Sequence, residues 1–101
     1  MKLPGKELRK LRLSLGLTMR DVEAASRSVV RTRRSRRFLV LASRLSEMEN
    51  KHIVPAAERL YTLSVLYRRP LESLLAFYRI PMRPAAKDRR AAGRTLRLRR
   101  S

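Results

Sequence analysis

Apolar residues recur at helical spacing near the start of the chain. Leu8, Leu11 and Leu15 fall on one face of a helix that the pattern predicts over residues 5–15. Gly16 follows this stretch, and glycine ends helices readily because it enters the left-handed backbone region without strain. The sequence therefore predicts a first amphipathic helix with a glycine stop.

A second, longer helix is predicted to begin at Thr18. The Thr18 hydroxyl can cap the helix, and Asp21 three residues later fits a capping box with aspartate in place of glutamate. We expect this helix to continue to about Arg34, and a linker then to return Phe38 and Val40 to the core. The apolar face of this helix is predicted to comprise Val22, Ala25 and Val29.

The middle of the chain predicts three more helices. A short polar helix over about 42–50 is followed by a turn ending at Pro55, then by an amphipathic helix over about 56–68. Pro70 is expected to open a last helix of the domain, over about 70–79, since proline is tolerated where a helix begins. The expected core positions are Leu45, Met48, Leu60, Leu63, Tyr67, Leu71, Leu74, Leu75 and Tyr78.

Charge is the dominant feature of the composition. Among 101 residues, 26 are Lys or Arg and 8 are Asp or Glu, which gives a formal net charge of +18. A charge this high opposes compaction and favours polyanionic partners, so nucleic acid is the expected partner. The length indicates one domain, and the hydrophobic fraction of 44% suffices for a small core.

The charge is concentrated toward the end of the chain. Residues 1–80 hold 18 basic and 7 acidic residues, whereas 81–101 hold 8 and 1. The last stretch contains prolines and little apolar periodicity, so we expect a mostly disordered basic tail with a short helix near 85–92. Four tail arginines could reach a minor groove or only add electrostatic attraction: Arg94, Arg97, Arg99 and Arg100.

Other classes of function find little support. The chain has no cysteine and one histidine, so disulfides, thiolate metal sites and histidine metal sites are not expected. No nucleophile–histidine pair, glycine-rich phosphate loop or paired carboxylates indicate an enzyme, and we expect no cofactor and no small-molecule ligand. The charged N-terminus and the lack of an apolar run of about 20 residues predict a cytoplasmic, nucleoid-associated protein without membrane contact.

The order of motifs resembles a known family. Leu17-Thr18 opens the second helix, Met48-Glu49 ends the polar helix, Asn50-Lys51 begins the turn, and Pro55 precedes a leucine-rich helix. This order resembles the lambda-repressor/Cro (Xre-like) helix-turn-helix family of bacterial DNA-binding regulators. The resemblance implies an all-α fold, a compact five-helix domain over 1–80 with an extended second helix, followed by the basic tail 81–101.

The chain departs from the family pattern between the second and third helices. Residues 27–41 replace a tight turn, and a long-insert subgroup of Xre-like regulators is similar in this respect. Lys51 stands where the family has glycine, and Met19 where it often has glutamine. Leu41 occupies the usual cap of the third helix, so Ser43 is expected to cap it instead.

The resemblance implies that the third helix enters the major groove of double-stranded DNA. An arginine fork matches the two acceptors of guanine, although Arg44 could instead contact phosphate or pair with Glu47. Glu49 is expected to brace the domain by pairing with a basic side chain, and His52 to be a loop residue. The residues expected at base edges are Ala42, Ser43, Arg44, Ser46 and Glu47. The residues expected at phosphates are Thr18, Met19, Arg31, Arg33, Arg34, Arg36, Arg37 and Lys51.

Two further expectations concern the arginines of the insert and the assembly. If the insert extends the second helix, its arginines should lie beside the third helix and follow the DNA backbone. A regulator of this kind is expected to be a homodimer on a palindromic site, and Phe77, Tyr78 and Ile80 are the predicted dimer surface. The alternatives are a non-specific DNA- or RNA-binding protein and an antitoxin-like protein-interaction module.

Overall fold

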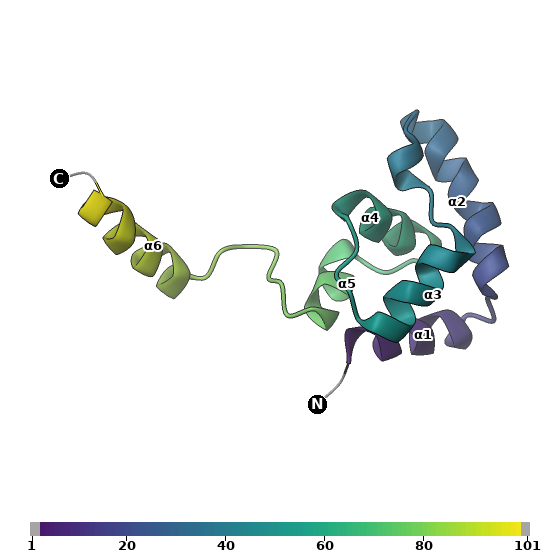
Figure 1. Cartoon of the computed structure of the whole chain (residues 1–101), viewed down its shortest axis with the longest axis horizontal. Coiled ribbons are helices and arrows are strands. Elements are labelled where there is room, and N and C mark those ends of the chain that lie inside the picture. Colours follow the sequence, from purple (N-terminus) through teal and green to yellow (C-terminus); the bar gives the residue numbers. More distant parts are fainter. Residues whose placement is uncertain (1–2, 100–101) are drawn as a thin grey trace.

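The computed structural model describes residues 3–99 (Figure 1). Of the tail arginines considered above, Arg100 lies outside this range, as do the first two residues of the predicted domain. All regular structure in the described part of the chain is helical, which confirms the all-α prediction. The elements are α1 (Pro4–Ser14), α2 (Met19–Arg33), the 3-10 helix η1 (Arg36–Phe38), α3 (Ala42–Lys51), α4 (Ala57–Leu66), α5 (Leu71–Phe77) and α6 (Ala86–Arg99).

The predicted start and stop signals operate in α1 and α2. Gly16 follows α1 with φ +70°, the left-handed conformation expected of a glycine stop. The Asp21 N–H donates to the Thr18 hydroxyl at 3.0 Å, and the Thr18 N–H donates to the Asp21 carboxylate at 2.9 Å. This capping box starts α2, which runs to Arg33 as the pattern predicted. Helices α4 and α5 lie within two residues of their predicted bounds at each end.

Five helices surround one small core. Helix α1 packs on α3 and α5, whereas α2 packs on α3 and α4. Every core position predicted for the middle helices is buried or packs against the core. The central cluster comprises Leu8, Val22, Val40, Leu45, Met48, Leu60, Leu63, Tyr67 and Leu74.

Two predicted core positions are wrong. Leu15 is exposed because α1 ends at Ser14, so the apolar stripe of α1 does not continue past its last turn. Ala25 is also exposed, and Ser26 is fully buried in its place. The Ser26 hydroxyl accepts the Val40 N–H at 3.1 Å and donates to the Glu23 carbonyl at 2.7 Å. The second helix therefore buries a polar residue that fixes the returning linker.

The connection between α2 and α3 returns Val40 to the core as predicted, whereas Phe38 is only half-buried and lies outside the core cluster. Val40 is fully buried, and the Phe38 ring packs edge-on against Tyr61 with centroids 5.8 Å apart. The Thr62 hydroxyl donates to the Phe38 carbonyl at 2.7 Å, which satisfies a backbone group of the connection. Residues 34–41 are thus held against α4.

The tail differs from its prediction. Instead of a short helix near 85–92 in a disordered arm, α6 spans 14 residues, Ala86–Arg99. Alanine, lysine and arginine are strong helix formers, and Asp88 in the first turn complements the helix dipole. Within the described residues α6 contacts no other helix, and it stands apart from the domain in Figure 1.

Candidate nucleic-acid interface

A side chain of another helix caps the start of α3. The Ala42 N–H donates to the Glu23 carboxylate of α2 at 2.7 Å, which satisfies one of the free donors at the start of α3. The cap position itself is Leu41, whose side chain makes no capping bond. The prediction that Ser43 caps α3 is therefore wrong, because Ser43 lies inside the first turn. Glu23 instead joins the start of α3 to α2.

Helix α3 divides into a buried and an exposed side. Leu45 and Met48 are buried as predicted. Of the five residues expected at base edges, Ser43 and Arg44 are exposed, and the remaining three, Ala42, Ser46 and Glu47, are partly exposed. All five therefore lie at the surface of one helix.

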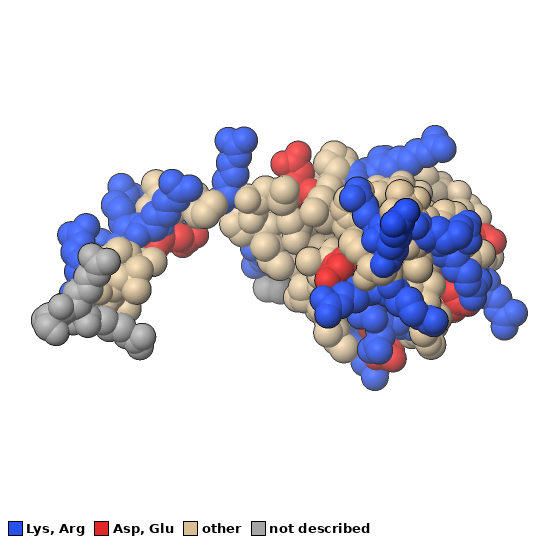
Figure 2. All heavy atoms as spheres, turned by 90° about the horizontal axis from the view of Figure 1, so that it is seen from above, with Lys and Arg blue, Asp and Glu red and all other residues tan. Residues whose placement is uncertain are grey.

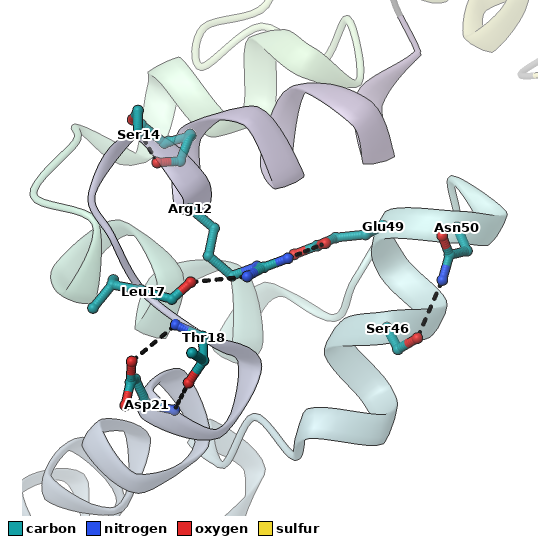
Figure 3. A network of polar contacts seen from close by, with 9 residues as sticks. Arg12, Ser14, Leu17, Thr18, Asp21, Ser46, Glu49 and Asn50 are labelled. Atoms are coloured by element: carbon teal, nitrogen blue, oxygen red, sulfur yellow. Dashed lines mark hydrogen bonds and ion pairs between the residues drawn. The ribbon is translucent and has the colours of Figure 1, made fainter.

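Polar contacts on this surface are weak. Arg44 Nη1 lies 3.8 Å from the Glu47 carboxylate, and both side chains are exposed. The Asn50 amide donates to the Ser46 hydroxyl at 3.1 Å (Figure 3). An exposed ion pair of this length contributes little to stability. The Arg44 guanidinium is therefore available for another acceptor.

A buried ion pair joins α1 to α3. Arg12 Nε donates to one Glu49 carboxylate oxygen at 2.8 Å, and Arg12 Nη2 donates to the other at 3.0 Å (Figure 3). A third donor, Arg12 Nη1, reaches the Leu17 carbonyl at 2.8 Å. The hydrogen bond to Glu49 raises the pKa of Arg12, and desolvation opposes part of that rise. The expected bracing role of Glu49 is confirmed, with Arg12 as its partner.

A second contact closes the same junction. The Gly5 N–H donates to His52 Nδ1 at 3.1 Å, so His52 is a packed cap at the end of α3 rather than a free loop residue. A Cβ at Gly5 would collide with the backbone carbonyl oxygen of Glu49. We call Gly5, Arg12, Glu49 and His52 the α1–α3 joint. The joint holds α3 on its buried side.

Tyr67 lies close to the joint. Its side chain is fully buried, and its hydroxyl has no hydrogen-bond partner within the described part of the protein. Burial raises the pKa of Tyr67, and the negative charge of Glu49 raises it further.

Five arginines form what we call the α2 tip. Arg33 lies over the Tyr61 ring, 5.1 Å from its centroid, and donates to its hydroxyl at 2.7 Å. Arg37 lies 3.9 Å from the Glu58 carboxylate. The α2 tip comprises Arg31, Arg33, Arg34, Arg36 and Arg37, all exposed.

The α2 tip does not lie beside α3, contrary to the prediction. Glu23 accepts the N–H of Ala42, the first residue of α3, and Ser26 accepts the Val40 N–H shortly before α3. This part of α2 therefore lies against the start of α3. At 1.5 Å per residue, Arg34 lies about 16 Å further along α2 than Glu23. The tip lies against α4 instead, because the linker that follows α2 folds back onto α4.

Several helix ends carry strained basic residues. Arg34 has φ 54° at the end of α2, and His52 has φ 58° at the end of α3. Arg68 and Arg79 share this left-handed conformation after α4 and α5. The conformation favours glycine, so a side chain is retained at these sites at some cost. For the three arginines, the positive charge at the end of a helix also complements the helix dipole.

The remaining predicted phosphate residues flank α3. Lys51 is exposed at the last turn of α3, and Thr18 is exposed at the start of α2. Hydrogen bonds from Thr18 lower the pKa of Asp21, its partner in the capping box. Met19 packs against the core cluster with only part of its side chain exposed.

Basic side chains cover much of the surface. Figure 2 shows them spread over the domain and along α6, with few acidic side chains between them. In the part of the chain that the structure covers, no group of three or more histidine or acidic side chains could hold a metal ion. None of the helices over residues 3–99 is both long and apolar enough to cross a bilayer.

The predicted dimer surface is only partly exposed. Phe77 and Tyr78 pack against the core cluster, and burial raises the pKa of Tyr78 to about 12. Of the three residues, Ile80 alone is exposed, at 38%.

Comparisons with protein-family models, with curated proteins and with solved structures found no match to this chain.

Sequence reasoning did not find Arg12 and Glu23, the residues that position α3. Arg12 sits four residues after Leu8 on the apolar face of α1, and Glu49 follows Met48 on the buried side of α3. Two opposite charges on apolar helix faces are a signal for a buried pair. Glu23, by contrast, carries no such local signal.

Proposed function

We propose that this protein is a sequence-specific regulator that binds double-stranded DNA through α3. The observation that carries the proposal is the fixation of α3. Its buried side is held by the Arg12–Glu49 pair and its first turn by Glu23, while Ser43 and Arg44 face solvent. Recognition of bases requires a surface held rigidly by its supporting residues.

The dimensions of α3 suit a major groove. The groove is about 12 Å wide and admits one α-helix, whose early residues face base edges. Arg44 is the candidate for a guanine, because its guanidinium has only a long, exposed contact with Glu47 to give up. Ala42, Ser43, Ser46 and Glu47 complete the proposed base-facing surface.

Phosphate contacts would come from the ends of the surface. The α2 tip lies about 16 Å beyond Glu23 along α2, and its exposed arginines are the proposed contacts with the DNA backbone outside the groove that α3 would occupy. Lys51 lies in the last turn of α3, and Thr18 and Met19 lie at the start of α2. We also propose phosphate contacts from the tail, to this duplex or to a second one.

A homodimer is part of the proposal. One short helix reads few base pairs, so two copies on a palindrome with half-sites about one DNA turn apart would supply useful specificity. The site of action would then be the nucleoid in the cytoplasm.

Selection from a randomised duplex DNA pool at physiological salt tests the proposal. We expect an enriched palindrome, and we expect Arg44→Ala to relax the preference at one position in each half-site by about 1–3 kcal/mol. Arg9→Ala, which removes an exposed arginine from α1, is the matched control and should leave the preference unchanged.

A non-specific DNA- or RNA-binding protein is the second candidate. The exposed arginines of the α2 tip favour it, since contacts to phosphate carry no sequence information. Binding without any enriched sequence, together with a uniform loss of affinity in Arg44→Ala, would support this candidate and contradict the first.

A further inference from the structure

Helix α6 carries a row of cations along one side. Lys87, Arg90, Arg94 and Arg97 are all exposed, and their spacing of three, four and three residues places them on one face of a helix. Asp88 lies on the other side of α6 at this periodicity. We call these four residues the α6 stripe.

The length of the α6 stripe matches a row of phosphates. Ten residues separate Lys87 from Arg97, which corresponds to about 15 Å along the helix axis. One strand of duplex DNA places a phosphate every 3.4 Å or so along its axis, so about four phosphates fall within that length. The number and span of the charges therefore fit a DNA backbone.

The rest of α6 offers little to another kind of partner. Around the stripe the helix has small residues and two bulky apolar residues, Leu96, whose exposure is 61%, and Leu98. The small residues are Ala86, Ala91, Ala92 and Gly93. A helix that binds a membrane surface needs a broad apolar face with residues such as Trp, Phe or Leu. An anionic membrane is thus disfavoured.

Helix α6 is also held away from the domain. It contacts no other helix among the described residues, and the segment that leads to it contains Pro81 and Pro84. Proline restricts the backbone and stiffens such segments. Figure 1 shows α5 and this segment between α3 and α6 along the length of the molecule.

We propose that α6 binds a second duplex DNA segment, so that one protein molecule bridges two duplexes. The inference rests on the proposed DNA binding of the domain and extends it. Since α6 contacts no other helix among the described residues, its stripe is free to take the phosphates of a duplex other than the one at α3. An isolated helix of this length is marginal in water, and neutralisation of its cations by phosphates would stabilise it.

Two measurements on the full chain test the proposal. Fluorescence anisotropy with one labelled duplex reports binding, and capture of a fluorescent duplex on beads that carry a second duplex reports bridging. The test variant replaces the α6 stripe by glutamine, a good helix former: Lys87→Gln, Arg90→Gln, Arg94→Gln and Arg97→Gln. The control variant removes four exposed charges from the domain: Lys6→Gln, Arg9→Gln, Lys10→Gln and Arg69→Gln.

Bridging is compared at protein concentrations that give equal occupancy of the single duplex. We expect the wild type and the control variant to capture the second duplex, and the stripe variant to fall to background. The log–log dependence of capture on salt should have a slope of about −3.6 for four phosphate contacts. The circular-dichroism helix signal of the wild type should rise when DNA is added, and that rise should be smaller in the stripe variant.

The outcomes separate the two proposals. No anisotropy change with any duplex contradicts the proposed function itself. Single-duplex binding without capture, or equal capture by the stripe variant, overturns bridging by α6 and leaves the proposed function intact. Stripe-dependent binding to phosphatidylglycerol vesicles, with no capture of a second duplex, would assign α6 to membranes and also overturn bridging.

Discussion

Arginine occupies two opposite environments in this protein. In the α1–α3 joint, Arg12 is buried and donates hydrogen bonds to the Glu49 carboxylate and to the Leu17 carbonyl. At the α2 tip, the arginines are exposed. Arg33 contacts Tyr61 and Arg37 contacts Glu58, and both contacts lie at the surface. The first arginine maintains the position of a helix, whereas the others keep their charge accessible to a ligand.

The difference shows that charge count alone does not identify a binding residue. Removing Arg12 would lower the net charge as much as removing Arg34 would, yet the two changes should act on different properties. The joint should control the free energy of unfolding, and the α2 tip should control affinity for polyanions. Four changes to the protein or to its solution test this division.

Glu49→Ala should break the joint most severely. It leaves the buried Arg12 guanidinium without its carboxylate, and breaking a buried pair costs about 3–5 kcal/mol. Urea unfolding followed by circular dichroism measures this loss. A double variant with Arg12→Met and Glu49→Leu should recover much of it, since both buried charges are then removed. A loss below about 1 kcal/mol, the usual value of a surface pair, would show that the joint does not act as a buried pair.

Gly5→Ala should strain the same joint without changing any charge. The added methyl group meets the Glu49 carbonyl, so α1 must move away from α3 at a cost of about 1–3 kcal/mol. The thermal unfolding midpoint reports the change. Gly93→Ala is the matched control, because a Cβ there meets no atom within 4 Å, and it should not destabilise the domain.

Arg34→Gly should separate stability from binding at the α2 tip. Glycine relieves the left-handed strain at φ 54°, which should stabilise the fold by about 1 kcal/mol. The same change removes a proposed phosphate contact, so the slope of log affinity against log salt should become shallower by about 0.9. Chemical unfolding and a salt titration of DNA binding measure the two effects. If stability and affinity moved in the same direction, the division between joint and tip would fail at this residue.

Alkaline pH should lower stability through Tyr67. Burial and the Glu49 charge hold its folded pKa above the value of about 10 in an unfolded chain. The unfolded state therefore loses its proton first, and stability is complete below pH 10 and falls as the pH rises above it. Tyr67→Phe should flatten this decline in urea unfolding at pH 9 to 11. Part of the decline should remain in the Tyr67→Phe variant, because burial also raises the pKa of Tyr78, to about 12.

Local patterns predicted the parts of the fold that depend on local physics. The capping box at Thr18 and Asp21, the stop at Gly16 and the length of α2 all follow from neighbouring residues. Burial of Leu45 and Met48 follows from helical periodicity on a single element. Each of these features needs only the chain within a few residues.

Features that depend on residues far apart in the chain could not be predicted from the sequence. Arg12 is buried because Glu49, 37 residues away, satisfies it, and a periodicity that counts arginine as polar assigns it to the surface. Ser26 is buried because it bonds the backbone of Val40. The position of the α2 tip depended on how the linker folds back, which no local pattern determines.

The two contacts that bind the connection to α2 have a mechanical consequence. Glu23 holds the first turn of α3, and Ser26 holds Val40 just before it. A change of length among the exposed arginines at the end of α2 would leave these two contacts in place, and with them the angle between α2 and α3. The end of α2 is in this respect an extension whose length is independent of the packing of α3. A change in its length would alter how far the protein reaches along a surface without altering the orientation of α3.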